Sequence, residues 1–372
     1  MKFHPQLFAT LTLLSVNLAQ ASENDAPTHA DGGAVYTMSN ASEGNVVLAY
    51  QRAANGALSL TATYPTGGYG FGAGLGNQGG VRLSDDNHWL FVVNAGSDEL
   101  SVFAVVKNGL RWVQTLKSGG VRPVSVASND ELVYVLNAGS DSIVGFKMNK
   151  KGQLQPIPNS DRPLSGTGTA PATIQFSQQG RDLVISEKAT NKLVVYELDR
   201  NGLPESTPAI INSVGQTPFG FSFGKHNNLY VSEAAGGTPN ASSVSAYHLT
   251  RNGDLEVIDG KVATNLTAAC WISITPDGRY LYSTDTGSNA VSGYSIDATG
   301  SLSLLSGNGA AAFTGAGSAP IDMAISDNGR FLYTLNTGNH TMSEFRIQAD
   351  GSLVSIGSLS SLPMAANGLA AR

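Results

Sequence analysis

Acidic side chains recur at one position in the sequence, at the end of a short apolar segment. Glu187 and Glu233 each follow a serine there, and Asp285 follows a threonine. A carboxylate can take a proton from water and so activate it for hydrolysis. A guanidinium or ammonium group, as in Arg82 or Lys188, can hold an anion or stabilise an oxyanion. We therefore predict Glu187 and Glu233 as catalytic residues and Arg82 and Lys188 as substrate-binding residues.

The same carboxylates also have a structural interpretation. The end of a strand carries backbone N–H groups that need partners, and a carboxylate can accept hydrogen bonds from them or pair with a nearby cation. The sequence leaves both interpretations open. Unchanged activity in Glu187→Gln and Glu233→Gln would refute the catalytic one.

Composition excludes several classes of function. The chain has 372 residues, 41% hydrophobic and 13% charged, which is enough apolar material for a folded core. Its net charge is −6 and it has no run of Lys or Arg, so we expect no nucleic-acid partner and no binding to anionic lipid. The six histidines are scattered, so we expect no zinc and no cofactor, and leave open only Ca²⁺ in an acidic channel. We expect a monomer that binds a small-molecule substrate or ligand.

The N-terminus predicts export. Lys2, the apolar stretch from Leu7 to Leu18 and a small-x-small site ending at Ala21 are typical of a signal peptide over residues 1–21. The stretch is too short and too polar for a membrane anchor. We therefore predict a secreted or periplasmic protein with no membrane insertion after cleavage, and a flexible leader over residues 22–31. Cys270 is the only cysteine, so no internal disulfide can form, and its apolar neighbours predict a buried side chain.

Internal repetition organises the rest of the chain. A polar turn followed by an apolar strand recurs every 44–51 residues, the period of a four-stranded propeller blade. These turns begin at Ser84, Ser128, Ser177, Gly224, Thr275 and Ser326. A second turn, an x-Gly hairpin that leads into leucine, occurs seven times, from Asn55-Gly56 to Asp350-Gly351.

Six turns of the first kind and seven of the second predict a circular closure. Blade one lacks its innermost strand at the N-terminus, and the tail 364–372 can supply it, which also removes exposed sheet edges. We predict an all-β, seven-bladed β-propeller over residues 33–372. Blade one comprises 33–68 and 364–372, and residues 67–80 form a glycine-rich connector. The other blades span 77–120, 121–170, 171–217, 218–267, 268–318 and 319–360.

The repeats resemble the lactonase family of seven-bladed propellers, which includes propeller-type 6-phosphogluconolactonases and carboxymuconate cyclases. The resemblance rests on Pro-Asp-Gly-Arg-Tyr-Leu-Tyr at 276–282, Asn-Gly-Arg-Phe-Leu-Tyr at 328–333 and Asp-Gly-Ser-Leu at 350–353. It implies the fold and a lactone substrate. Enzymatic members typically carry an Arg-His pair at the head of an inner strand, which is absent here. Their acidic position after the second strand is kept at Glu187 and Glu233.

In a propeller the innermost strands line a central channel. Period-2 alternation places two rings of mostly small, polar side chains there. The first ring is Gly80, Ser125, Thr173, Gly220, Trp271, Asp322 and Gly368, and the second is Arg82, Ala127, Gln175, Ser222, Ser273, Ala324 and Ala370. We predict a polar funnel in which the substrate-binding residues are Arg82, Gln175, Lys188, Trp271, Asp285 and Asp322.

Two functions are consistent with this pattern. The first is an exported enzyme that opens or closes a lactone ring with carboxylate acid–base residues. The second is a non-catalytic propeller that binds a ligand, a glycan or a protein partner at its rim, favoured by the missing histidine. A deep pocket with convergent charged groups would favour the enzyme, and a plugged or shallow centre would favour the binding protein.

Overall fold

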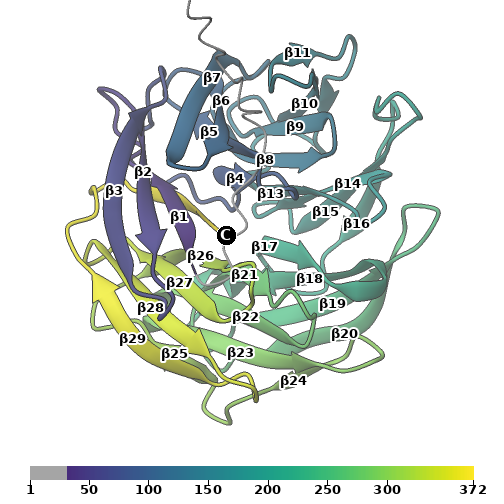
Figure 1. Cartoon of the computed structure of the whole chain (residues 1–372). Coiled ribbons are helices and arrows are strands. Elements are labelled where there is room, and N and C mark those ends of the chain that lie inside the picture. Colours follow the sequence, from purple (N-terminus) through teal and green to yellow (C-terminus); the bar gives the residue numbers. More distant parts are fainter. Residues whose placement is uncertain (1–31) are drawn as a thin grey trace, which may run out of the picture.

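The computed structural model describes residues 32–372, so the predicted signal peptide (1–21) and leader (22–31) lie outside the described residues. These residues form seven antiparallel sheets arranged in a ring around a central hub (Figure 1). The helices in this part of the chain are single 3-10 turns, η1 (Lys225–Asn227), η2 (Ala235–Gly237) and η3 (Thr286–Ser288). None of the described helices is long and apolar enough to cross a membrane.

Each sheet is one blade, with its strands ordered from the hub outward. The first three blades are built from the following strands: β30 (Asn367–Ala371), β1 (Gly33–Met38), β2 (Val46–Arg52) and β3 (Leu58–Pro65) in blade 1; β4 (Val81–Leu83), β5 (Trp89–Asn94), β6 (Glu99–Val106) and β7 (Gly109–Lys117) in blade 2; β8 (Pro123–Asn129), β9 (Leu132–Asn137), β10 (Ser142–Met148) and an outer edge divided into β11 (Leu154–Pro156) and β12 (Arg162–Pro163) in blade 3.

The same order holds in the other four blades. They contain these strands: β13 (Pro171–Phe176), β14 (Asp182–Glu187), β15 (Lys192–Glu197) and β16 (Ala209–Asn212); β17 (Pro218–Phe223), β18 (Asn228–Glu233), β19 (Ser243–Leu249) and β20 (Leu255–Ala263); β21 (Ala269–Ile274), β22 (Tyr280–Asp285), β23 (Ala290–Ile296) and the divided edge β24 (Leu302–Leu304) and β25 (Ala310–Phe313); β26 (Pro320–Ile325), β27 (Phe331–Asn336), β28 (Thr341–Ile347) and β29 (Leu353–Leu359).

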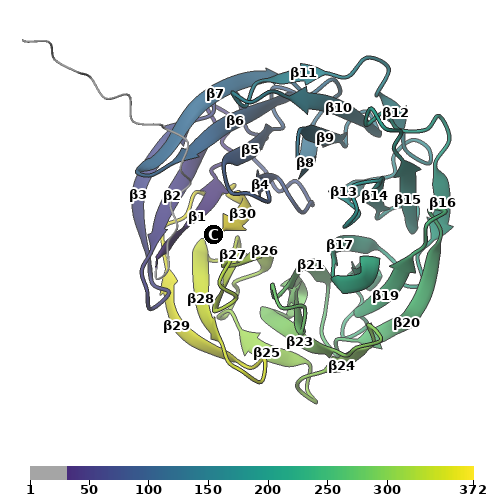
Figure 2. The ribbon, with the colours of Figure 1, turned by 45° about the vertical axis from the view of Figure 1, so that its right-hand side comes forward.

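The predicted closure of the ring is confirmed. The last strand, β30, pairs with β1 in an antiparallel ladder that aligns Tyr36 with Ala370, so both ends of the described chain share blade 1 (Figure 2). Arg52 strengthens this contact, because its Nη2 donates to the carbonyl oxygens of Gly32 at 3.1 Å and Arg372 at 3.3 Å. The ring therefore closes through hydrogen bonds between residues more than three hundred positions apart.

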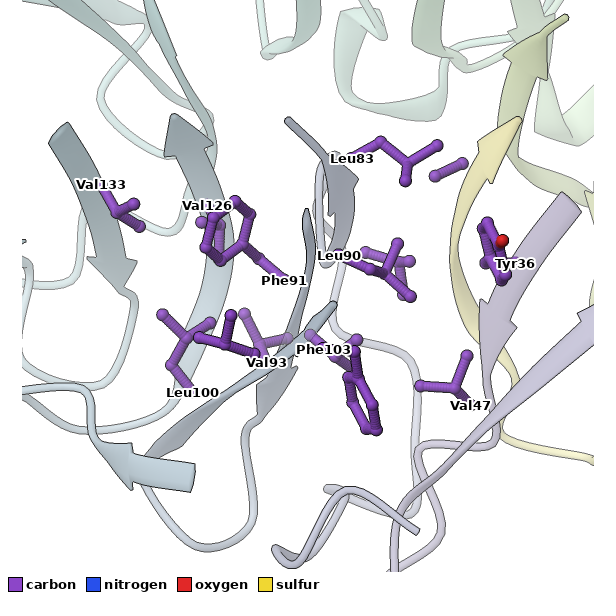
Figure 3. Packing of buried hydrophobic residues seen from close by; sticks show 14 of the residues in the cluster. Tyr36, Val47, Leu83, Leu90, Phe91, Val93, Leu100, Phe103, Val126 and Val133 are labelled. Atoms are coloured by element: carbon purple, nitrogen blue, oxygen red, sulfur yellow. The ribbon is translucent and has the colours of Figure 1, made fainter. Parts of the chain in front are cut away.

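The hydrophobic core lies between neighbouring blades. Alternation along each strand turns one apolar face toward the blade before it and the other toward the blade after it. In the cluster of Figure 3, Tyr36 and Val47 of blade 1 pack with Phe103 of blade 2, and Phe91 packs toward Val126 of blade 3. This packing fixes the angle between blades and therefore the width of the hub.

The two ends of the hub differ in construction. We call the end where the inner strands begin the strand-head face, and the end where the inner and second strands are joined the turn face. Most inner strands contain a β-bulge just after the head, for example between Pro171 and Thr173 and between Pro320 and Asp322. A bulge inserts an extra residue, so it changes which of the following side chains, between the bulge and the turn face, point into the hub.

Candidate functional site

A polar cavity of about 410 Å³ occupies the hub. That size is within the range of small-molecule pockets. Its polar lining includes Arg82, Thr173, Gln175, Ser222, Ser273 and Asp322, which come from the inner strands of five blades. Of the predicted substrate-binding residues, the structure therefore brings Arg82, Gln175 and Asp322 together at one cavity.

Arg82 supplies the positive charge of this cavity. It lies in β4 between Val81 and Leu83, whose side chains are buried among the blades, so alternation turns the Arg82 side chain into the hub. Within residues 32–372 its guanidinium makes no hydrogen bond and no ion pair. Burial lowers its pKa, and the negative charge of Asp85 partly opposes this effect. An arginine whose five N–H donors lack protein partners is suited to bind an oxygen-rich ligand.

Asp322 supplies a buried carboxyl group to the same cavity. It lies directly after the bulge in β26 and is 3% exposed. Its Oδ1 accepts a hydrogen bond from the backbone N–H of Met323 at 2.8 Å. Burial raises the pKa of Asp322 well above its usual value, although hydrogen bonds from the N–H groups of Met323 and Leu369 act in the opposite direction. A buried carboxyl group with a raised pKa can take a proton from water and return it, as a general base must.

Hydroxyl and amide groups complete the lining. Gln175 donates through Nε2 to the carbonyl oxygen of Phe221 at 2.5 Å, and Ser273 donates through Oγ to that of Met323 at 3.3 Å. Ser222 is half-buried at the cavity wall. Such groups can exchange hydrogen bonds with the hydroxyls of a polar ligand.

The structure places Glu187 and Glu233 inside their blades and not at the cavity. Both are fully buried at the strand-head end of the second strand. Glu187 accepts a hydrogen bond from the N–H of Ser165 at 2.8 Å and others from the hydroxyls of Ser165 and Thr190. Each oxygen of this carboxylate is thus held by the connection that leads into its own blade or by its neighbouring turn.

Glu233 has the same kind of surroundings. Its Oε1 accepts the N–H of Gly215 at 2.8 Å and the hydroxyl of Ser245 at 2.6 Å, and Ser243 donates to Oε2. These contacts match the structural interpretation of the sequence pattern, in which a carboxylate satisfies backbone groups at a strand end. The predicted grouping of Glu187 and Glu233 with Arg82 in one funnel therefore differs from the structure.

Asp285 occupies the equivalent position in blade 6 but is less well satisfied. It is fully buried, Ser292 donates to its Oδ2, and its Oδ1 has no hydrogen-bond partner among the described residues. Burial raises the pKa of Asp285 to about 7, although the hydrogen bond from Ser292 acts to lower it. In blades 2 and 7 the same position holds asparagine, and Asn94 and Asn336 each donate through Nδ2 to a serine hydroxyl at 2.8 Å.

This comparison between blades predicts that Asp285→Asn removes a destabilisation of the fold that grows with pH. A carboxyl group whose pKa is raised from 3.8 to about 7 in the folded protein lowers the free energy of unfolding as pH rises through that interval. Between pH 5 and pH 7 the free energy of unfolding of the variant should therefore gain on that of the wild type by about 1.4 kcal/mol per pH unit. Urea denaturation at several pH values measures this difference.

The reverse substitution is the matched control. Asn336→Asp in blade 7 should introduce the same loss of stability with rising pH, because it places a carboxyl group in an equally buried position. Parallel stability curves for the wild type and Asp285→Asn would contradict the raised pKa.

Lys188 and Trp271 lie at the strand-head end of the hub, outside the cavity lining. Lys188 Nζ donates to the carbonyl oxygen of Gly76 and lies 4.6 Å from the centre of the Phe219 ring. Trp271 is buried against Phe219, with ring centres 4.9 Å apart. Burial lowers the pKa of Lys188 to about 8. The two residues therefore pack the end of the channel, which differs from the predicted role in the funnel.

The sequence pattern missed Gln78, which lines the cavity although it belongs to the glycine-rich connector. The connector has no strand periodicity, so nothing in the sequence indicates where its side chains point. No three His, Cys, Asp or Glu side chains of residues 32–372 converge in a metal-binding arrangement. The Ca²⁺ site stays a prediction.

The fold and the cavity define a seven-bladed propeller with a polar pocket in its hub. The profile described as "Lactonase, 7-bladed beta-propeller" matches residues 21–167 and 224–320. Because this match covers more than half of the chain, the protein belongs to that lactonase family, and the predicted resemblance is confirmed.

Individual relatives are distant. The 6-phosphogluconolactonase of Buchnera aphidicola subsp. Schizaphis graminum is 25% identical over 175 residues, which are 46% of this chain and 50% of that protein. The matched region thus spans about half the length of this relative. A Bacteroides uniformis protein proposed to be a 6-phosphogluconolactonase has a TM-score of 0.73 at 18% identity, over 91% of this chain and 99% of its own. The periplasmic gluconolactonase of Pseudomonas aeruginosa has a TM-score of 0.67 at 16% identity, over 90% and 98%. These structural likenesses show the fold alone.

Proposed function

We propose that the protein hydrolyses, or in the reverse direction forms, a small polyhydroxylated lactone in the hub cavity. Membership of the lactonase family and the lactonases among its relatives support the reaction class. The observation that carries the proposal is the presence, in one cavity, of an arginine without a protein partner and a buried carboxyl group with a raised pKa.

In the proposed mechanism Asp322 acts as the general base. Its carboxylate takes a proton from water as the water oxygen attacks the lactone carbonyl carbon, and the Arg82 guanidinium stabilises the oxyanion that forms. The ring C–O bond then breaks, and the protonated Asp322 returns the proton to the departing ring oxygen. The product is the open hydroxy acid, so one lactone and one water are consumed. Hydroxyl and amide groups, such as those of Ser222 and Gln175, bind the substrate hydroxyls.

This assignment moves the catalytic role from Glu187 and Glu233 to Asp322. Both glutamates are committed to hydrogen bonds within their blades, whereas Asp322 lines the cavity. Export of the enzyme stays a prediction, since it depends on residues 1–21.

The experiment is a pH-stat measurement of acid release from a panel of aldonolactones, including D-glucono-1,5-lactone, corrected for spontaneous hydrolysis. Arg82→Gln removes the guanidinium and should lower kcat/KM by about 100-fold, the usual effect of losing an oxyanion donor. The matched control is Arg251→Gln, because Arg251 is exposed in an outer turn of blade 5.

Equal activity in Arg82→Gln and Arg251→Gln would contradict the assigned role of Arg82. No turnover of any lactone by the wild type, together with saturable calorimetric binding of D-gluconate, would instead support the second function, a non-catalytic ligand-binding propeller.

A further inference from the structure

The connector between blades 1 and 2 enters the hub. It spans residues 66–80, between β3 and β4, whereas the equivalent connection between β7 and β8 spans only residues 118–122. Figure 2 shows the loop before β4 projecting inside the ring toward β13. Leu75 anchors it, because this side chain packs against the apolar cores on both sides of blade 3.

The connector bonds to the inner edges of the blades. An innermost strand has no neighbour on its hub side, so its N–H and C=O groups there need other partners. The N–H of Gln78 donates to the carbonyl oxygen of Ala172 at 2.9 Å, and the N–H of Val126 donates to that of Gly79 at 3.0 Å. Asn77 Nδ2 donates to the carbonyl oxygen of Val124. The connector is therefore held to blades 3 and 4 as an additional edge.

The side chain of Gln78 extends this bonding to blade 6. Its Nε2 donates to the carbonyl oxygen of Ile272 at 2.9 Å, and its Oε1 accepts the N–H of the same residue at 3.2 Å. Blade 5 leaves room for the amide only because residue 220 is glycine: a Cβ there would lie 2.1 Å from Gln78 Oε1. Gln78 thus links blade 4, through its backbone N–H, to blade 6, through its side-chain amide.

Behind Gln78 the strand-head face is closed. Lys188 holds the connector through the carbonyl oxygen of Gly76, and the rings of Phe219 and Trp271, packed on each other at a tilt of 49°, fill the space beside it. Gly76 has a φ of +60°, a left-handed conformation that glycine adopts without strain. The cavity therefore ends at Gln78.

The turn face provides the opening. Asp85, Asn87 and Asp327 line the cavity there, and Asn87 Nδ2 donates to Asp327 Oδ2 at 2.7 Å between the turns of blades 2 and 7. Blade 1 lies between them, and no turn joins its strands β30 and β1 at this face, because they come from opposite ends of the described chain. We call the opening bordered by Asp85, Asn87 and Asp327 the mouth.

From this arrangement we infer that Gln78 is a specificity-determining residue: its amide forms the floor of a blind pocket entered at the mouth and limits how far a ligand can extend into the hub. This inference rests on the proposed function for the reaction, although its prediction about ligand size applies equally to binding. Neither the family match nor the sequence pattern assigns a role to this residue.

The test replaces Gln78 with alanine and compares two ligand sizes. D-Glucono-1,5-lactone carries one sugar unit, and lactobionolactone carries a galactosyl group in addition. The wild type should favour the smaller lactone, and Gln78→Ala should raise the ratio of kcat/KM for the larger over the smaller lactone at least 10-fold. Gln155→Ala, at the exposed outer edge of blade 3, is the matched control and should leave this ratio unchanged.

Binding of the open acids separates this inference from the proposed function. Calorimetry with D-gluconate and lactobionate should show the same shift in preference even if neither lactone is turned over, in which case only the proposed hydrolysis fails. If Gln78→Ala does not fold, Gln78→Asn keeps the amide on a shorter side chain and should shift the preference in the same direction. An unchanged size preference in a folded variant, or binding of neither acid to either protein, would overturn the role of Gln78.

Discussion

A chain that ends at Ala366 is expected to lose cooperative folding. The deletion removes β30, so the inner edge of blade 1 loses its ladder with β1, and Arg52 loses its acceptor at Arg372. It also removes Leu369 and Ala370 from two apolar clusters. Net stabilities of domains are only about 5–15 kcal/mol, and an opened ring adds a fresh sheet edge to the lost contacts.

Near-ultraviolet circular dichroism, thermal unfolding and size-exclusion chromatography would measure this loss. Leu369→Ala keeps the backbone of β30 and is the graded control, with an expected cost of about 2–4 kcal/mol. A truncated protein that unfolds cooperatively at the wild-type temperature would show that the ring does not depend on β30.

Asp322→Asn is expected to lower kcat for lactone hydrolysis by about 10²–10⁴-fold, the usual contribution of a general base. The amide has nearly the same shape and can still accept the hydrogen bond from Met323 through its oxygen, but it cannot take a proton from water. Because the base must be deprotonated, wild-type activity should rise as pH increases through the raised pKa of Asp322. The residual activity of the variant should lack this acidic limb.

Stability and activity separate in this variant. An amide cannot ionise, so the free energy of unfolding of Asp322→Asn should gain on that of the wild type as pH rises through the raised pKa of Asp322. A variant that is folded and fully active would contradict the assigned role of Asp322.

The fold was predictable because each blade repeats its own local signals. Polar turns such as those at Ser84 and Thr275 mark the ends of inner strands, and the surplus x-Gly hairpin indicates the strand exchange at β30. These signals depend on backbone geometry within a few residues, which the sequence specifies directly.

The site was predictable only in part. Simple alternation places Arg82, Gln175 and Asp322 at the hub, as observed. It does not show that the hydroxyls of Ser243 and Ser245 hold Glu233 inside its blade, because strand register is needed to bring these residues together. Each such contact depends on neighbours that periodicity does not identify.

Tertiary structure also decides what covers the hub. Trp271 shares the alternation pattern of the hub residues, yet it packs on Phe219 at the strand-head end. The amide of Gln78 bonds to the neighbouring Ile272 and separates this end from the cavity. The path of a long glycine-rich connector follows from the edges that it can bond to, and these exist only once the ring has formed.

The most direct test of catalysis in the hub is a crystal structure of the Asp322→Asn variant soaked with the aldonolactone that the wild type hydrolyses fastest. We expect the intact lactone in the hub cavity, with its carbonyl oxygen at the Arg82 guanidinium and its far end against Gln78. A lactone bound at the strand-head face, beside Glu187 and Lys188, would contradict catalysis in the hub.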